Sequence, residues 1–172
     1  MAEHESEPSS PPPPIVLIVG DDRDTRDLYE AVFELEGFWV ADASDAEAAF
    51  QQASDLQPDV VITDVGLPGR IDGVDLATRI HAMAKTASVP VIAITGRNPE
   101  EIALSEFTEV LQKPVSPNLL IAAARRVLAE SAALRDRGDQ ARKGIPELRE
   151  RSNRLTERSQ HLRERPDRRR EP

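Results

Sequence analysis

The chain contains no cysteine, which excludes disulfide bonds and zinc sites built from cysteine ligands. Its three histidines, His4, His81 and His161, are too scattered along the sequence to indicate a metal site. The apolar runs are only a few residues long, far short of a membrane-spanning helix. The first residues also lack the charged start and long apolar stretch of a signal peptide. We therefore expect a cytoplasmic protein.

Charge is distributed unevenly along the chain. The overall net charge is -9, but residues 1–130 carry -14 and residues 131–172 carry +5. An acidic body followed by a basic tail indicates two physically different units. The acidic body is unsuited to nucleic acid, whose phosphates attract basic surfaces.

Both ends of the chain differ in composition from its middle. Residues 1–14 are polar and end in four prolines, which predicts a disordered, Pro-rich leader. Leu148, Leu155 and Leu162 recur every seven residues in the tail, but Ser152 and Ser159 hold the partner positions of a coiled-coil seam. We expect residues 131–172 to be helical in part and frayed or disordered at the end. Weak self-association, partner docking, weak binding to anionic surfaces and a plain solvated helix remain open for this tail.

Short apolar runs alternate with helix-like stretches in residues 15–130. Strands are predicted at 15–19, 59–64 and 89–95, with weaker candidates at 38–40 and 108–111. Apolar spacing predicts helices at 25–36, 44–53 and 72–85, a short one at 99–105 and a longer one from 117. Ser44 and Glu47 have the spacing of a capping box at the second helix. This order predicts an α/β fold with a doubly wound, five-stranded parallel sheet.

Polar residues follow the predicted strands where each one ends. Asp21 and Asp22 follow the first strand, Asp64 ends the third, Thr95 ends the fourth, and Lys113 follows the fifth. Because ligands of such sheets bind beyond the carboxyl ends of the strands, we expect these side chains to lie at one edge. Crowded carboxylates with oxygen donors suit Mg²⁺, and a lysine and a hydroxyl suit phosphate. These are the parts of a phosphoryl-transfer site.

In this order the motifs resemble the receiver domain of two-component response regulators, over about Ile15 to Glu130. The matching stretches are IVLIVGDDRDTRDL, DVVITDVGLPGRIDGVDLA, VPVIAITG and VLQKPVS. The resemblance implies a flavodoxin-like fold with Asp64 as the phosphoacceptor. It also implies that Mg²⁺ is held by Asp21, Asp64 and the backbone carbonyl of Gly66, that Thr95 and Lys113 contact the phosphoryl oxygens, and that the peptide bond between Lys113 and Pro114 is cis. Asp22 is a further candidate metal ligand.

The sequence departs from the family pattern at several positions. Gly20 stands where the family has its first acidic residue, which predicts weaker Mg²⁺ binding. Val110 replaces the aromatic switch residue, and the short 95–113 interval predicts a reduced fourth helix. Arg70 resembles an insertion in the loop after Pro68, and Gly66 has no side chain to shield a phosphoryl group, which Arg97 would cover only in part.

The resemblance implies a signalling switch that is phosphorylated by a histidine kinase or a phosphotransfer protein and acts through protein–protein interaction. Gly20 and Val110 keep a second reading open, that of an interaction module which needs no phosphate. Too few residues follow the body for a DNA-reading unit, so direct DNA binding is disfavoured. No nucleotide-binding loop of the GxxxxGK[ST] type is present, so any enzymatic activity is limited to Mg²⁺-dependent self-phosphorylation from small donors and self-dephosphorylation.

Overall fold

The computed structural model describes residues 12–98 and 104–137. Its contacts divide the chain into two compact units, Met1–Ser131 and Ala132–Pro172. Of the second unit only residues 132–137 are described, and they are helical. The leader up to residue 11 and the leucine heptads of the tail lie outside the described residues, so the predictions made for them stay predictions.

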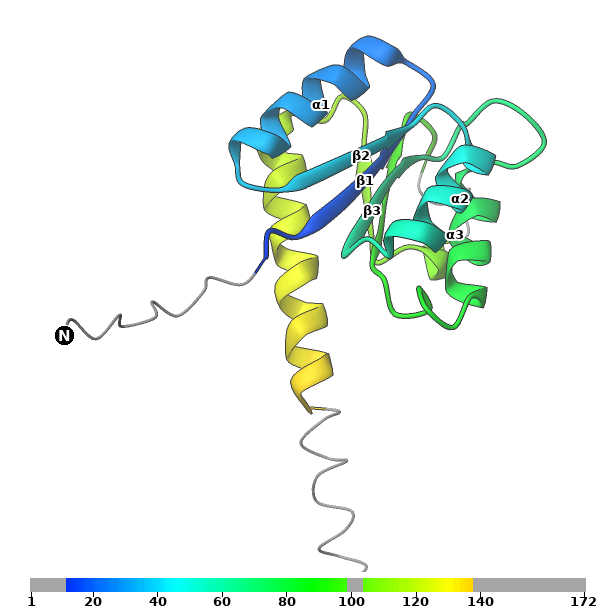
Figure 1. The fold of residues 1–172 in the computed structure, drawn as a ribbon. Helices are drawn as coiled ribbons and strands as arrows, with labels where there is room; N and C mark the ends of the chain where they lie inside the picture. The colour runs from blue at the N-terminus through cyan, green and yellow to red at the C-terminus, as the bar shows by residue number, and fades with distance from the viewer. Residues whose placement is uncertain (1–11, 99–103, 138–172) are drawn as a thin grey trace, which may run out of the picture. The chain divides into compact units, whose positions relative to one another are not determined.

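A five-stranded parallel sheet forms the centre of the first unit (Figure 1). Its strands lie in the order β2-β1-β3-β4-β5, which confirms the predicted doubly wound α/β fold of the flavodoxin-like type. The inner strands are almost fully buried because helices cover both faces of the sheet. The bounds of the strands are β1 Ile15–Val19, β2 Trp39–Ala43, β3 Val60–Asp64, β4 Val91–Thr95 and β5 Glu109–Gln112.

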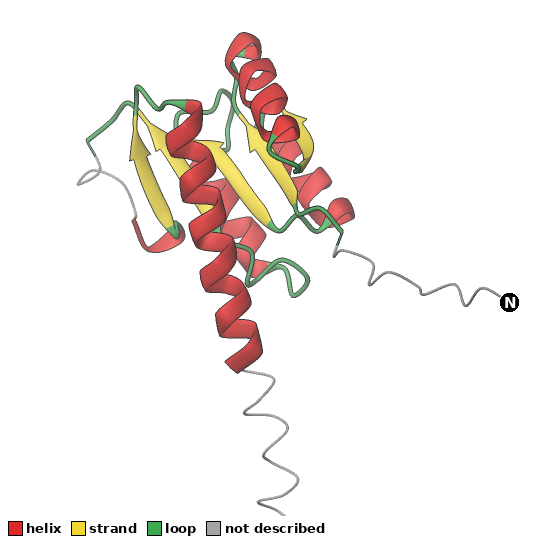
Figure 2. Cartoon of the chain, turned by 90° about the vertical axis from the view of Figure 1, so that its left-hand side faces the viewer, coloured by secondary structure: helices red, strands yellow, loops and turns green. Residues whose placement is uncertain are grey.

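Helices pack against the two faces of the sheet as two layers (Figures 1 and 2). One face carries α1 (Arg23–Leu35) and the helical residues 117–131, whose apolar side chains form one core cluster around Phe33 and Leu120. The other face carries α2 (Ala46–Leu56) and α3 (Gly73–Ala82), which pack around Leu76 and Ile80. The stripes predicted from apolar spacing are buried in part: in α1 Phe33 is buried, but Leu28 and Leu35, predicted on the same stripe, are exposed.

Several helix boundaries differ from their predictions: α2 continues to Leu56 instead of ending at residue 53, and α3 ends at Ala82 instead of residue 85. Helix α1 begins two residues early, at Arg23, because Asp22 caps it. The capping box predicted at Ser44 is wrong: Asp45 is the N-cap of α2, and its carboxylate accepts a hydrogen bond from the backbone N–H of Ala48 at 2.9 Å. A capping box does occur in α3, where Asp72 is the N-cap.

The connection between β4 and β5 contains one described helical turn, the 3-10 helix η2 (Leu104–Glu106). The helix predicted over 99–105 falls largely on residues 99–103, which lie outside the described residues. The hydroxyl of Thr78 on α3 donates to the Glu106 carboxylate at 3.1 Å and connects this turn to α3.

The register of the strands brings their carboxyl ends to one edge of the sheet. Val19 pairs with Thr63, Asp64 with Ile94, and Thr95 with Gln112. The residues that follow β1 and β5 therefore lie at the same edge as the last residues of β3 and β4. This edge carries all the residues that the sequence singled out for phosphate and metal chemistry.

Candidate functional site

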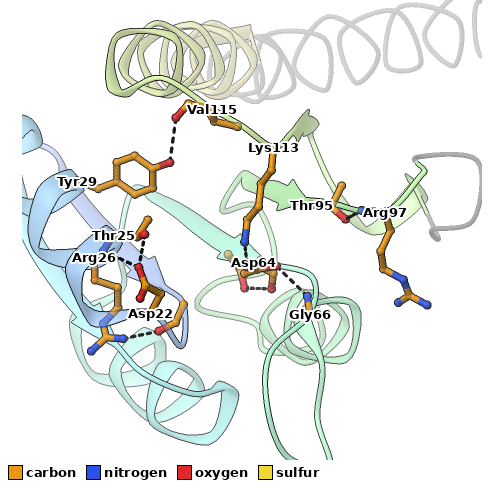
Figure 3. A network of polar contacts seen from close by, with 12 residues as sticks. Asp22, Thr25, Arg26, Tyr29, Asp64, Gly66, Thr95, Arg97, Lys113 and Val115 are labelled. Carbon is orange, nitrogen blue, oxygen red and sulfur yellow. Dashed lines mark hydrogen bonds and ion pairs between the residues drawn. The ribbon is translucent and has the colours of Figure 1, made fainter.

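Asp64, the last residue of β3, lies at the centre of this edge. Its side chain is 15% exposed, and the backbone N–H of Gly66 donates to its Oδ1 at 2.9 Å. The ammonium of Lys113 forms an ion pair with Oδ2 (Figure 3). Both carboxylate oxygens thus have a donor, and the carboxylate remains open to solvent on one side.

Lys113 follows β5, and its backbone is tied to the neighbouring strand. Its N–H donates to the carbonyl of Thr95 at 2.8 Å, and the peptide bond to Pro114 is cis, as the resemblance implied. The side chain is 47% exposed, so the ammonium reaches Asp64 across an open surface. The backbone is fixed at its strand end while the side chain keeps freedom to move.

Thr95, the last residue of β4, is 1% exposed. Its hydroxyl oxygen accepts a hydrogen bond from the backbone N–H of Arg97 at 2.9 Å. Figure 3 shows the side chain of Arg97 directed away from Asp64. In this structure the hydroxyl of Thr95 is therefore engaged in its own loop, and the guanidinium of Arg97 does not cover the carboxylate.

Asp22 caps helix α1 from the end of the loop that follows β1. Its carboxylate accepts hydrogen bonds from the hydroxyl of Thr25 and from the Thr25 backbone N–H, the latter at 2.9 Å. The hydroxyl bond is the largest cause that lowers the pKa of Asp22 below its usual value, followed by the backbone bond. The charges of Arg26 and Lys113 lower this pKa further. Asp22 is therefore a helix cap whose carboxylate stays ionised.

Arg26 is held at the base of the same loop. Its side chain is 12% exposed, Nη1 donates to the backbone carbonyl of Gly20 at 2.6 Å, and Nε donates to the Asp42 carboxylate at 3.0 Å. A methyl group added at Gly20 would lie 3.9 Å from Cγ of Arg26, which is ordinary contact. The position at which the family has an acid therefore has room for a side chain, and a guanidinium lies beside it.

Tyr29 lies one helical turn beyond Arg26 and is 8% exposed. Its hydroxyl donates to the backbone carbonyl of Val115 at 3.2 Å, in the loop that carries Lys113. Burial is the largest cause that raises the pKa of Tyr29, while Lys113 lowers it and Asp64 raises it. The phenol therefore remains a protonated donor at neutral pH.

These groups surround one cavity of about 50 Å³, room enough for water molecules or a small hydrated ion. The carboxylates of Asp21, Asp22 and Asp64 and the ammonium of Lys113 form its polar part. Thr95 and Gly66 do not line it, although Gly66 contacts Asp64 directly. The remaining lining residues are Ile18, Val19, Gly20, Thr25, Arg26, Tyr29, Ile62 and Ile94.

The functional interpretation of the sequence overlooked two of these lining residues, Arg26 and Tyr29. Their spacing could have identified them, because Asp22, Arg26 and Tyr29 follow the i, i+4, i+7 pattern of one helix face. These three residues share one face of α1, and this face lines the cavity at the carboxyl ends of the strands. Val110, at the aromatic position of the family, is partly buried against the core on the α2 and α3 side.

Comparison with known proteins identifies the family of the chain. The family model for the response regulator receiver domain matches residues 16–125. The chain belongs to this family. It is 32% identical over 128 residues to the aerobic respiration control protein ArcA of Escherichia coli, and 28% identical over 117 residues to the phosphate regulon transcriptional regulatory protein PhoB of Pseudomonas aeruginosa. These alignments cover 70% and 66% of this chain but 51% of each regulator, so the chain spans about half their length.

Solved structures show the same relationship. A response regulator from Desulfuromonas acetoxidans superposes with a TM-score of 0.60 at 30% identity and covers 67% of this chain and 96% of its own. The chemotaxis response regulator CheY4 of Vibrio cholerae gives a TM-score of 0.62 at 26% identity, covering 67% and 98%. Receiver domains are signalling modules of two-component systems rather than conventional enzymes, and they generally bind Mg²⁺ at the phosphorylation site. The family supports a phosphoacceptor signalling role for this chain and interaction with histidine kinases or phosphotransfer proteins.

Across residues 12–98 and 104–137, no helix has both the length and the apolar character that crossing a bilayer requires. Over the same ranges, no three histidine, cysteine or acidic side chains come close enough together to hold a metal ion by themselves. Mg²⁺ is usually held by only one or two carboxylates and keeps several waters. The absence of a three-ligand cluster in these ranges is therefore compatible with a Mg²⁺ site.

Proposed function

We propose that this receiver domain is a phosphorelay switch in which Asp64 accepts the phosphoryl group from a histidine kinase or a phosphotransfer protein. The observation that carries the proposal is the position of its carboxylate at a strand end, paired with the ammonium of Lys113 and lining the same cavity as Asp21. One side of the carboxylate is open, which in-line attack on an incoming phosphorus requires. No other carboxylate of the cavity is paired with a lysine among the described residues.

In the transfer step an oxygen of Asp64 attacks the phosphorus of a phosphohistidine. The new bond from phosphorus to the Asp64 oxygen forms as the bond from phosphorus to the imidazole nitrogen breaks, and the imidazole leaves with the bonding electrons. Lys113, already at the carboxylate, follows the negative charge onto the transferred oxygens and neutralises part of it. Gly66 donates its N–H to the carboxylate and holds the attacking group in place.

Mg²⁺ is the proposed cofactor, and the donor set of the cavity fits it. Asp21 and Asp64 offer carboxylate oxygens, and the resemblance adds the backbone carbonyl of Gly66. When bound, the ion would supply positive charge against the negative oxygens of the phosphoryl group. Asp22 is a further candidate ligand, and Thr25 donates both of its hydrogen bonds to Oδ2 of this carboxylate.

Thr95 is proposed to transmit the effect of Asp64 phosphorylation to the loop that follows β4. Its hydroxyl accepts a bond from the N–H of Arg97 and has a proton to donate to a phosphoryl oxygen on Asp64. A rotation toward that oxygen would shift the start of the loop that follows β4. A switch from 1:99 to 99:1 needs roughly 5.5 kcal/mol of differential interaction between the two states. The output is proposed to be protein–protein interaction, and any activity of the domain is limited to phosphorylating and dephosphorylating itself.

The test is the intact mass of the protein after incubation with acetyl phosphate and Mg²⁺, beside the variant Asp64→Asn. We expect one added phosphoryl group in the wild type and none in the variant. The variant keeps the size of the side chain and the acceptor oxygen for Gly66 while it removes the nucleophilic carboxylate. Phosphate uptake by Asp64→Asn would assign the reaction to another residue.

A second candidate function, that of a phosphate-independent interaction module, is favoured by Gly20. The carbonyl of this residue is bonded by Arg26, so the loop carries a cation where the family carries an acid. A magnesium titration followed by the amide resonances of the Asp21 loop separates the two candidates. Saturable shifts support the phosphorelay switch, and their absence at millimolar Mg²⁺ supports the interaction module.

A further inference from the structure

Tyr29 connects helix α1 to the loop that carries Lys113, across 86 residues of sequence. The loop is fixed at one end by the bond from the Lys113 N–H to the Thr95 carbonyl, at 2.8 Å. At its other end Ser116 caps the following helix, accepting from the N–H of Leu119 at 3.3 Å. Between these two points, the hydroxyl of Tyr29 holds the carbonyl of Val115 at 3.2 Å.

The burial of Tyr29 favours this contact. The residue is 8% exposed and belongs to the same core cluster as Phe33 and Phe38, while part of it lines the site cavity. A buried tyrosine hydroxyl without a partner is costly, which keeps the Val115 carbonyl close even though the bond is long for an O–H donor. Burial also raises the pKa of Tyr29, which keeps the proton on the donor.

The loop position controls where the ammonium of Lys113 lies. The lysine side chain is 47% exposed and flexible, so its approach to Asp64 depends on the backbone from which it extends. Val115 is two residues from Lys113, and a shift of its carbonyl is passed along the rigid ring of Pro114. Displacements of about 1 Å in a reacting group can lower a rate by up to about 100-fold.

We propose that Tyr29 is a positioning residue for phosphotransfer: through the Val115 carbonyl it holds the loop backbone so that the Lys113 ammonium lies over the Asp64 carboxylate. This inference rests on the proposed function of Asp64. It assigns to helix α1 a role in the site beyond the helix cap at Asp22.

The test is Tyr29→Phe, which keeps the ring in the core and removes only the hydroxyl. We expect the rate constant of phosphorylation by acetyl phosphate at saturating donor and Mg²⁺ to fall about tenfold, within the range for misplaced groups. The half-saturating Mg²⁺ concentration should stay unchanged, because Tyr29 offers nothing to the metal. Thr86→Val is the matched control: it also removes a buried hydroxyl, which donates to the Ile80 carbonyl at 2.7 Å, and it should leave the rate constant unchanged.

A double-mutant cycle separates positioning from general loosening. In a Lys113→Ala background, Tyr29→Phe should have no further effect on the rate constant, since its action passes through the lysine. A wild-type rate constant in Tyr29→Phe would overturn the inference and leave the proposed function intact. An equal fall in both backgrounds would also overturn it, because the loss would not act through Lys113.

A second measurement reports the position of the Lys113 side chain in the unphosphorylated protein. The chain has three lysines, so the side-chain Cε resonance of Lys113 is assignable by comparison with Lys113→Arg. We expect Tyr29→Phe to shift this resonance and Thr86→Val to leave it in place. If the wild type takes up no phosphate, the proposed function of Asp64 fails, and this resonance alone decides the positioning. An unshifted resonance in Tyr29→Phe would then overturn it.

Discussion

Replacing Gly73 with alanine is expected to destabilise the domain at the strand end that carries Asp64. Gly73 is the first residue of α3, and its N–H donates to the carbonyl of Val65 at 3.0 Å. A Cβ atom at this position would lie 2.8 Å from Cα of Val65 and 3.1 Å from the carbonyl carbon of Asp64. These are backbone atoms, so no side-chain rotation relieves the overlap.

The size of the effect follows from these contacts. Overpacking in well-packed regions costs about 1–3 kcal/mol, and the upper part of this range applies because α3 has to move away from the end of β3. A loss of about 3 kcal/mol lowers the melting temperature of a domain of this size by roughly 10 °C. The same displacement separates Asp64 from Lys113, so phosphorylation by acetyl phosphate should slow as well, when it is measured at a temperature at which the variant is folded.

Urea denaturation followed by circular dichroism measures the free energy of unfolding, with Gly96→Ala as the matched control. A Cβ at Gly96 meets no atom within 4 Å, and its φ is not positive. Alanine there should be neutral or stabilise by about 0.4–1 kcal/mol, through the lower entropy of the unfolded chain. The reasoning is refuted if Gly73→Ala unfolds with the same free energy as the wild type.

Three further predictions concern the same edge of the sheet. Gly66→Asn should lengthen the lifetime of the phosphorylated protein, measured by mass after removal of the donor, because a Cβ there would lie 3.7 Å from Oδ1 of Asp64 and its side chain would hinder water. Gly20→Asp should tighten Mg²⁺ binding about tenfold in a calorimetric titration, since a nearby charge contributes at least about 1 kcal/mol even in water. The pKa of Asp45 is lowered, first by the N–H of Ala48 and then by the hydroxyl of Ser44, so its contribution to stability is present above its usual pKa and disappears as the pH falls through the lowered value. We therefore measure the urea concentration at the midpoint of unfolding as a function of pH. In Asp45→Asn this midpoint should fall less at acidic pH than it does in the wild type.

The strands were predictable because their signal is local. The run of β1 is apolar throughout and that of β4 is apolar up to Thr95, as is typical of strands that are covered on both faces. The bounds of β2 were predicted least well: the strand was expected over 38–40 and is observed over Trp39–Ala43. Its second half contains Asp42 between two alanines, which have little preference for strands. Pairing with β1 extends it, and no local pattern records that pairing.

The cap of α2 shows a similar limit. Ser44 and Asp45 are adjacent, and both residue types favour the N-cap position. The choice is made by the helix face that packs on the sheet, since Ala46, Ala49 and Ala53 are all buried. A helix that begins at Ala46 places these alanines inward and leaves Asp45 as the cap. Tertiary packing therefore determines which residue caps α2, whereas the sequence alone is compatible with both Ser44 and Asp45.

The site was predictable as far as topology determines it. Parallel strands place their carboxyl ends together, and this rule alone put Asp21, Asp64 and Lys113 at one edge, where the structure has them. The rule does not determine which way a side chain turns. The hydroxyl of Thr95 is taken by the N–H of Arg97, and the carboxylate of Asp22 by Thr25, through hydrogen bonds that depend on the loop backbone.

The contacts of Asp64 define what phosphorylation would require of the loop after β5. Its Oδ1 accepts from Gly66 and its Oδ2 is paired with Lys113, so a phosphoryl group on the carboxylate displaces at least one of these donors. The ammonium can follow the charge because the lysine side chain is half exposed, whereas the backbone beneath it is held by Thr95 and by Tyr29 through Val115. Because the backbone is fixed and the ammonium can move, Lys113 can neutralise the negative charge of the phosphoryl group without a rearrangement of the loop. In the proposed switch, the phosphorylated state then acts on the hydroxyl of Thr95, which is bound within its own loop by the N–H of Arg97.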